Sequence, residues 1–397
     1  MALPGLVAVV SARPTGGDPD PPASEEKAIT SIAVPIPDVT VTVGVDTHKD
    51  VHVAVALDAL GRQLGELAVA TTTAGYQKLH HWATTFGHVE SFGLEGTGSY
   101  GAGLARHLRR GGARVIEVNR PDRATRHRKG KSDPIDAEAA ARSVLAGTAT
   151  AIPKAGDDQV EVIRMLKLAR DSAVKSQTQA VNQLKAVLVT APAELRESLN
   201  DLGPVALLER CAGLRPGKPS TPVPAAKYTL RLLAQRALTL RTEAKHLREH
   251  LDALTAAAAP ALRELTGVGP DTAAALLLAA GDNPHRLSSE AAFAALCGTN
   301  PVPASSGKIT RHRLNRGGNR QANAALHRAV VTRMHWHEPT KTYVARRTAE
   351  GKTTPEIMRC LKRYLARQVY RSLLPQVPET ANDEHVADKP KDLHLAA

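Results

Sequence analysis

Four acidic residues stand at positions where a folded chain could gather them around a metal ion. Asp46 and Glu95 each end an apolar, strand-like run, while Asp133 and Asp136 open a helix-like segment. Carboxylate oxygens are the ligands that hard divalent cations such as Mg²⁺ prefer. Residues three apart share one face of a helix, so Asp133 and Asp136 would point the same way. The four carboxylates are therefore candidate metal ligands if the two strands and the helix converge.

Each of these residues also has an ordinary explanation. Asp46 suits a turn at the end of a strand, and Asp133 before Pro134 suits a helix N-terminus. The joint occurrence of the four in this order of elements favours the metal site. Two Mg²⁺ ions about 3.5–4 Å apart can stabilise both the attacking and the leaving oxygen of a phosphoryl displacement.

The elements that must position these residues alternate between strand and helix signals. Residues 40–150 predict three strands, a helix, a strand, a helix, a strand and a helix. This order predicts a mixed sheet with helices packed on it, within a chain of class α/β plus α. The expected strands are 41–46, 51–57, 63–70, 89–94 and 115–118, and the expected helices are 74–86, 100–110 and one that begins at Ser132 or Asp133.

The composition favours a polyanionic partner. The chain has 397 residues, a formal net charge of +13 and a pI near 9.8, which favours binding to nucleic acid. Aromatic residues are only 3%, which argues against a base-stacking platform for single strands. Three widely separated cysteines form no zinc or disulfide pattern, which fits a reducing cytoplasm. No apolar run is long enough to span a membrane, and we expect no membrane partner.

The rest of the chain predicts extensions, a helical region and a second domain. Residues 1–39 and 376–397 have the composition of disordered segments. Residues 157–258 predict two long helices around a proline-rich stretch, and 260–375 a mostly helical domain. Both an antiparallel hairpin and a coiled coil between chains fit the seam of the second long helix, which has 3,4 spacing. That seam is Leu230, Leu233, Ala237, Leu240, Ala244, Leu247, Leu251 and Leu254.

Three blocks of sequence resemble one known family. Val43-Gly-Val-Asp46, Leu94-Glu-Gly-Thr-Gly-Ser-Tyr100 and the stretch 131–140 are similar to the motifs of the DEDD transposases of the insertion sequence 110 family. The resemblance implies a RuvC-like variant of the ribonuclease H fold for residues 40–150. It also implies that Asp46, Glu95, Asp133 and Asp136 are a catalytic tetrad that binds Mg²⁺, two ions per site. Gly96, where family members often have Ala, is a small departure.

A serine-containing loop lies in the predicted second domain. From the residues alone, Ser305-Ser-Gly307 is better explained by a flexible loop before a basic, phosphate-contacting helix than by a nucleophile. The stretch resembles the C-terminal transposase domain of the same family, in which the serine before a glycine is catalytic. This implies Ser306 as the nucleophile, with Ser305 as the fallback. Cationic side chains near it are candidates for binding phosphate: Lys308, Arg311, Arg313, Arg316 and Arg320.

Two further segments predict contacts to a nucleic-acid backbone. Residues 265–276 resemble a helix-hairpin-helix, in which Gly267 and Gly269 would let a phosphate approach a helix N-terminus. A helix–helix turn that needs glycine for packing is the alternative. A basic run precedes the Asp133–Asp136 pair and would hold the backbone near the metals, although a solvated basic face explains it too. The candidates in this run are Arg123, Arg126, Arg128, Lys129 and Lys131.

Together these patterns predict a transposase that recombines DNA. The resemblance implies Mg²⁺-dependent strand cleavage and exchange through a serine–DNA intermediate, on double-stranded donor and target DNA. It further implies guidance by a non-coding bridge RNA, and action at the nucleoid in a bacterial cytoplasm. The helical seam favours a homo-oligomer, a dimer or a tetramer. A RuvC-like structure-selective nuclease and a non-catalytic RNA- and DNA-binding protein remain as alternatives.

Overall fold

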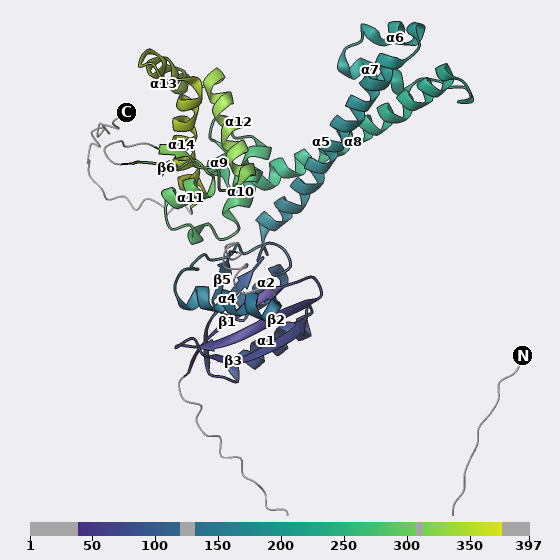
Figure 1. Ribbon diagram of the computed structural model, residues 1–397. Helices are drawn as coiled ribbons and strands as arrows, with labels where there is room; N and C mark the ends of the chain where they lie inside the picture. The colour runs from purple at the N-terminus through teal and green to yellow at the C-terminus, as the bar shows by residue number, and fades with distance from the viewer. Residues whose placement is uncertain (1–38, 120–131, 307–311, 375–397) are drawn as a thin grey trace, which may run out of the picture.

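A five-stranded mixed sheet forms the N-terminal part of the protein (Figure 1). The computed structural model describes residues 39–119, 132–306 and 312–374. The strands lie in the order β3-β2-β1-β4-β5. β1 is antiparallel to β2 and parallel to β4, β2 is antiparallel to β3, and β4 is parallel to β5. Their bounds are β1 Thr40–Thr47, β2 Val51–Asp58, β3 Gln63–Ala70, β4 His88–Glu95 and β5 Val115–Val118.

Helices cover both faces of this sheet and bury its central strands. α1 (Thr73–Thr84) and α2 (Ala102–Arg110) pack on one face, where they meet the odd-numbered valines of β1. α4 (Asp133–Leu145) packs on the other face, against Val55 and Leu57 of β2. The predicted order of strands and helices is confirmed. The mixed sheet is consistent with the RuvC-like fold that the resemblance implies.

A glycine allows α4 to lie directly on β1. A Cβ atom at Gly44 would stand 2.0 Å from the carbonyl oxygen of Ala137 and 2.3 Å from the backbone nitrogen of Ala141. Such distances exclude any side chain at Gly44, so strand and helix meet backbone to backbone. This close contact places the N-terminus of α4 beside the end of β1, where Asp46 lies.

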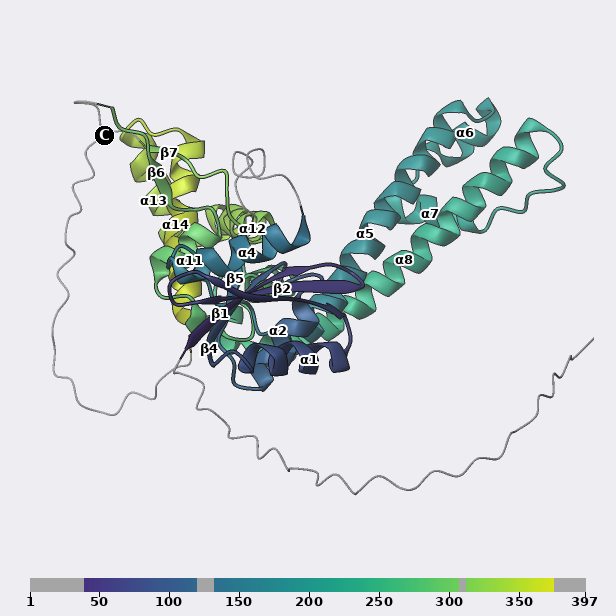
Figure 2. The same ribbon diagram turned by 60° about the horizontal axis from the view of Figure 1, so that its bottom comes forward.

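Two long helices extend from the body of the protein as an arm, here meaning residues 159–258 (Figures 1 and 2). The two predicted long helices are confirmed, but two short helices at the far end of the arm were not predicted. Their leucines pack together with the long helices in a separate apolar core, as do Leu184 and Leu230. The helices are α5 Gln159–Thr190, α6 Ala193–Asn200, α7 Pro204–Ala212 and α8 Pro222–Ala258.

The seam of α8 is buried unevenly. Leu230, Ala237 and Leu251 are fully buried, whereas Leu240 and Leu247 in the middle of the helix are only half-buried. The long helices α5 and α8 lie side by side within one chain and run in opposite directions (Figures 1 and 2). The hairpin is thus one of the two expected arrangements, and pairing between chains stays a prediction.

The C-terminal part is mostly helical and surrounds α10. This helix is rich in Ala and Leu and is buried along most of its length, which lets its neighbours pack closely around it. The predicted helices near residues 319 and 355 are α12 and α14, and α13 lies between them. The elements are α9 Pro260–Arg263, α10 Pro270–Ala280, a 3₁₀ turn at Pro284–Arg286, α11 Glu290–Leu296, β6 Pro301–Pro303, β7 His312–Leu314, α12 Arg320–Trp336, α13 Glu338–Ala349 and α14 Thr354–Leu373.

The linker, residues 146–158, is hydrogen-bonded to both parts of the chain. The Asn283 amide accepts from the backbone N–H of Ala155 at 3.0 Å and donates to the carbonyl of Pro153 at 3.0 Å. On the other side, the Arg109 guanidinium of α2 donates to the carbonyl of Ala155 at 3.0 Å. Asn283 is buried, so its removal would leave linker backbone groups without partners. These bonds attach the sheet to the helical part.

Two expectations from composition concern the whole chain. Cys211, Cys297 and Cys360 are all free thiols, as the lack of a disulfide pattern predicts. In the part of the chain that the structure describes, every helix is too short or too polar to cross a membrane. The predicted N- and C-terminal extensions fall at 1–39 and 376–397, almost wholly outside the described residues.

Candidate metal centre and serine hairpin

Two of the predicted acidic residues lie on neighbouring parallel strands. Asp46 is near the end of β1 and Glu95 is the last residue of β4. The register pairs Val45 with Leu94, so Asp46 and Glu95 follow as the next residues of the two strands. Both residues are only 7% exposed. Their side chains share the face of the sheet that carries α4, since Val45 and Leu94 pack on the opposite face.

The other two acidic residues stand in the first turn of α4. Asp133 is its first residue. Asp136, three residues later, lies on the same face of the helix and is 7% exposed. Ser132 occupies the predicted cap position, but its hydroxyl makes no capping hydrogen bond. Carboxylates in the first turn of a helix are stabilised by its positive N-terminal end. We refer to Asp46, Glu95, Asp133 and Asp136 as the acidic edge.

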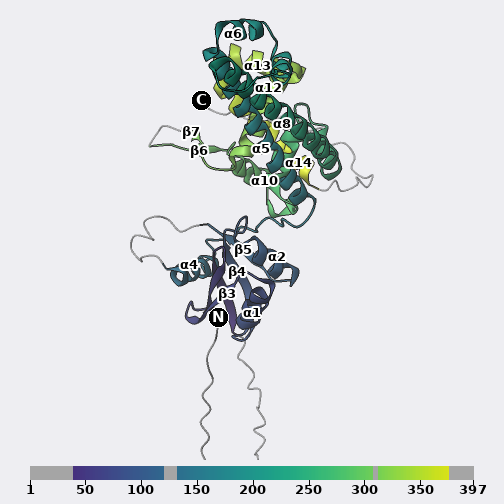
Figure 3. The same cartoon turned by 90° about the vertical axis from the view of Figure 1, so that its right-hand side faces the viewer.

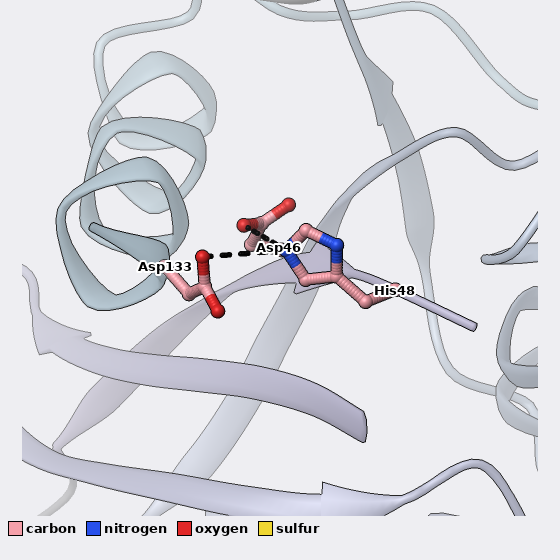
Figure 4. A group of neighbouring side chains, drawn as sticks. All are labelled: Asp46, His48 and Asp133. Carbon is pink, nitrogen blue, oxygen red and sulfur yellow. Dashed lines mark hydrogen bonds and ion pairs between the residues drawn. The ribbon is translucent and has the colours of Figure 1, made fainter. Parts of the chain in front are cut away.

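A histidine that the sequence did not predict lies between two of these carboxylates (Figure 4). The Nε2 atom of His48 is 3.1 Å from Oδ2 of Asp46 and 3.3 Å from Oδ1 of Asp133. The signal was available, since Asp46 and His48 are two residues apart and side chains two apart along a strand point to one face. The sequence places His48 in the turn between the first two strands, as the structure does, but gives it no role in the site.

The electrostatics of the acidic edge favour a bound cation. Burial raises the pKa of Asp46, the His48 ring lowers it, and the negative charges of Asp136 and Asp133 raise it further. Gathered carboxylates of this kind repel one another, and a divalent ion would relieve that repulsion. One ligand atom from each of Asp46, His48 and Asp133 lies within 4.8 Å of the others, a spacing that a single ion can bridge. The residues therefore fit a divalent metal.

The loop after Glu95 is fixed at its base. The Thr47 hydroxyl donates to the carbonyl of Glu95 at 2.9 Å, and Gly96 has a φ of +61°, which favours glycine. The following residues, 97–99, line a cleft of about 1120 Å³ between α2, the start of α5 and the helical part. Its walls carry cationic side chains suited to phosphate (Arg106, Arg110, Lys154 and Arg320) and also acidic ones (Asp157, Asp158, Glu161, Asp171 and Asp282), of which Glu161 is already paired with Arg164.

The predicted nucleophile lies on an exposed hairpin of the helical part. Ser305 and Ser306 follow β6 and are both exposed. β6 pairs with β7 with Pro303 opposite His312, so the serines belong to the connection between these strands. The ribbon projects from the helices around it (Figure 3). We refer to β6, β7 and their connection as the serine hairpin.

The predicted phosphate-binding residues divide into two groups. Arg313 on β7 and Arg316 just after it are exposed, and Arg320 opens α12 and lines the cleft. Lys308 and Arg311 of the serine hairpin lie outside the described residues. So does the basic run before Asp133, with Arg123, Arg126, Arg128, Lys129 and Lys131.

The two glycines of the helix-hairpin-helix-like segment differ. Gly267 has a φ of +84°, and a Cβ atom there would stand 2.7 Å from the carbonyl oxygen of Ala329 in α12. Its absence of a side chain thus serves helix packing, the alternative that the sequence left open. Gly269 is exposed at the N-terminus of α10 and has open space around it, which suits an approaching phosphate.

Comparison with known proteins agrees with the motifs. A family model of DEDD type, described as "Transposase", matches residues 43–191, and one described as "Transposase IS116/IS110/IS902 family" matches residues 259–345. Together they cover more than half of the chain. The insertion element IS110 uncharacterized 43.6 kDa protein of Streptomyces coelicolor is 32% identical over 134 residues. That match spans 33% of this chain and 33% of the length of the relative.

Proposed function

The chain belongs to the IS116/IS110/IS902 family of transposases, and we propose on this basis that it cleaves and rejoins DNA strands at a composite site. One half of the site is the acidic edge, and the other is Ser306 on the serine hairpin. The observation that carries the proposal is that Asp46 of β1 lies close enough to Asp133 and Asp136 of α4 to feel their charges, while Glu95 follows at the matching position of the neighbouring strand β4. Elements distant in the sequence do not gather buried like charges without a function that repays their repulsion.

Asp46, Glu95, Asp133 and Asp136 would hold Mg²⁺, and the proposal is for two ions. Bound there, the ions would supply charge stabilisation for a phosphate that gains negative charge as it reacts. The acidic edge itself positions its oxygens through β1, β4 and α4, whose packing allows little movement. On the walls of the adjoining cleft, which carry both cationic and acidic side chains, Arg106 and Arg320 would contact the DNA backbone.

Ser306 would make the covalent link to DNA. Its Oγ atom loses its proton and forms a bond to the phosphorus, while the bond from phosphorus to one sugar oxygen breaks and that oxygen gains a proton. A sugar hydroxyl of the new partner strand then attacks the serine–DNA phosphodiester and releases Ser306. Each step makes one phosphoester bond and breaks one, so the exchange needs no ATP. Arg313 on β7 and Arg316, two residues after it, would bind the phosphate oxygens.

The proposed partners are double-stranded donor and target DNA, a non-coding bridge RNA and further copies of the chain. The net charge of +13 supports nucleic-acid binding in general. Guidance by RNA rests on the family resemblance, and base pairing by that RNA would supply the recognition of the DNA sequence. The long arm offers a surface on which copies could associate.

The decisive experiment is recombination of donor and target plasmids by purified protein with its RNA and Mg²⁺. We expect strand exchange and a DNA adduct whose peptide contains Ser306. Asp46→Ala and Ser306→Ala should each abolish exchange, while Ser305→Ala is the matched control that keeps the adduct. The proposal would be refuted if the Asp46→Ala and Ser306→Ala proteins were as active as the wild type. An adduct on Ser305 would move the nucleophile by one residue.

A structure-selective nuclease is the second candidate function. It is favoured by the fact that the acidic edge is already assembled within one chain, whereas the serine hairpin is exposed. Such an enzyme needs only the acidic edge. Cleavage that survives Ser306→Ala, with no covalent adduct in the wild type, would select this candidate. Binding of RNA and DNA with no Mg²⁺-dependent cleavage would select a non-catalytic role.

A further inference from the structure

His48 occupies a position that a purely structural histidine does not need. Its ring is about half exposed and stands between the carboxylates of Asp46 and Asp133 at the open end of the acidic edge (Figure 4). We propose that His48 is a direct nitrogen ligand of the metal ion held there, so that this position prefers a divalent transition ion such as Mn²⁺ to Mg²⁺. This inference rests on the proposed metal centre and deepens it.

The distances match those between two ligands on one ion. Donor atoms about 2.1 Å from a metal and about 90–105° apart are about 3.0–3.3 Å from each other. Nε2 of His48 lies 3.1 Å from Oδ2 of Asp46 and 3.3 Å from Oδ1 of Asp133. A neutral imidazole with its proton on Nδ1 presents the Nε2 lone pair in the direction of both oxygens. The three side chains thus already have the spacing of a coordination shell.

The backbone holds His48 in this place independently of its ring. His48 directly follows β1, and its N–H donates to the carbonyl of Val51 across the turn into β2 at 3.3 Å. The preceding residue, Thr47, is bonded to the carbonyl of Glu95 on β4. The turn is therefore anchored on both neighbouring strands, and the imidazole is prepared to bind a metal rather than brought in by one.

The donor types decide which ion is preferred. Mg²⁺ binds almost entirely to oxygen, whereas imidazole nitrogen strengthens the binding of Mn²⁺ and later transition ions. Asp46, His48 and Asp133 offer two oxygens and one nitrogen. A histidine that only donates a hydrogen bond to the two carboxylates would leave when any ion binds. Its replacement would then change the affinities for Mg²⁺ and Mn²⁺ equally. A metal ligand and a hydrogen-bond donor can therefore be distinguished.

The test uses Mn²⁺ as a probe of the full-length protein. We expect electron spin-echo envelope modulation of the Mn²⁺-loaded wild type to show coupling to one imidazole nitrogen, and His48→Ala and His48→Gln to lose it. The affinity for Mn²⁺, measured from the free-ion electron paramagnetic resonance signal, should fall about tenfold or more in both variants. The affinity for Mg²⁺, measured by competition, should change less than about threefold. His88→Ala is the control, since His88 is exposed at the opposite end of the sheet.

Each other outcome overturns the inference in a recognisable way. Mn²⁺ bound without nitrogen coupling in the wild type, or equal losses of Mg²⁺ and Mn²⁺ affinity in the variants, would leave His48 as a hydrogen-bond donor only. The proposed function would survive either result. A wild type that binds neither ion would refute the metal centre itself, and His48→Gln, which conserves size and polarity, separates loss of the ligand from loss of the fold.

Discussion

The acidic edge and the serine hairpin differ in how firmly their own chain fixes them. Asp46, Glu95 and Asp136 are each 7% exposed and stand on strands and a helix that share a packed core. Ser306, in contrast, follows a three-residue strand, and every residue of β7 is exposed. A two-stranded ribbon has little stability without further packing. The metal half of the proposed site stands on packed elements, whereas Ser306 lies beside a short, exposed ribbon.

The difference suggests that the two halves have different roles in the reaction. Electrostatic stabilisation requires oxygens and charges that are fixed before the reaction begins. A nucleophile that changes partners during strand exchange gains from reach. The serine hairpin would acquire its working position from what it binds, either DNA or a second chain. We therefore expect the two halves to be separable by experiment.

The largest effect should come from mixing two inactive variants. Asp136→Asn removes one charge of the acidic edge, and Ser306→Ala removes the nucleophile. Alone, each should lower strand exchange by a factor on the order of 10³ or more, since residues that act as a unit fail together. If the halves meet between chains, an equimolar mixture should regain measurable exchange in the plasmid assay.

The control for this mixture is each variant at the same total protein concentration. Recovery in the mixture alone shows that one chain supplies the acidic edge and another the serine. A mixture no more active than its components would place both halves in one chain. Ser306 would then act with the acidic edge of its own chain.

A second, smaller effect should come from loosening the linker. Asn283→Ala leaves the N–H of Ala155 and the carbonyl of Pro153 without their partner, at about 1–3 kcal/mol for each buried group. We expect faster hydrogen exchange at the Ala155 amide and a lower melting temperature. Exchange activity should fall less than about tenfold, because halves that meet between chains do not depend on the distance within one chain.

Asn200→Ala, at an exposed position at the end of α6, is the matched control and should change neither property. A loss of activity with Asn283→Ala as large as that with Ser306→Ala would contradict this view. The linker would then set the geometry of a site within one chain.

The sequence predicted the acidic edge because its signals are local. Apolar runs that end in carboxylates and a proline at the start of a helix determine where Asp46, Glu95 and Asp133 stand, and parallel pairing of β1 with β4 joins them. α6 and α7 were missed because eight or nine residues of helix give little periodicity, and only packing against the long helices stabilises them.

His48 and the position of the serine hairpin were beyond sequence reasoning for different reasons. No sequence motif marks His48. It can be recognised as part of the site only because it lies beside Asp133 at the N-terminus of α4, and Gly44 allows α4 to pack close to β1. Where Ser306 lies relative to the acidic edge depends on how the sheet, linker and helical part are joined. These are tertiary contacts, which cannot be predicted from the spacing of residues or from composition.

The smallest predicted effect concerns the rigidity of the sheet under the acidic edge. His52 pairs with Thr47 across β1 and β2, is fully buried, and stacks on Tyr76 of α1 at 5.7 Å. Among the described residues, neither of its ring nitrogens has a hydrogen-bond partner. Burial lowers the pKa of His52, the nearby Val51 backbone raises it without meeting the geometry of a hydrogen bond, and the charge of His48 lowers it further.

His52 therefore lowers the stability of the sheet in acid. Above a pH of about 6.5 the ring is neutral in both states and contributes no pH dependence. As the pH falls below that value, the unfolded chain binds a proton that the folded chain excludes. The free energy of unfolding then decreases by at most about 1.4 kcal/mol per pH unit until the folded pKa is reached.

His52→Phe, which keeps a ring on Tyr76, should flatten this part of the curve of stability against pH, whereas His81→Phe at an exposed site of α1 should not. Thermal melts of the three proteins between pH 5 and 7.5 measure the difference. Parallel curves for wild type and His52→Phe would show that the ring is hydrated or already charged, and that the core beneath the acidic edge is looser than its burial indicates.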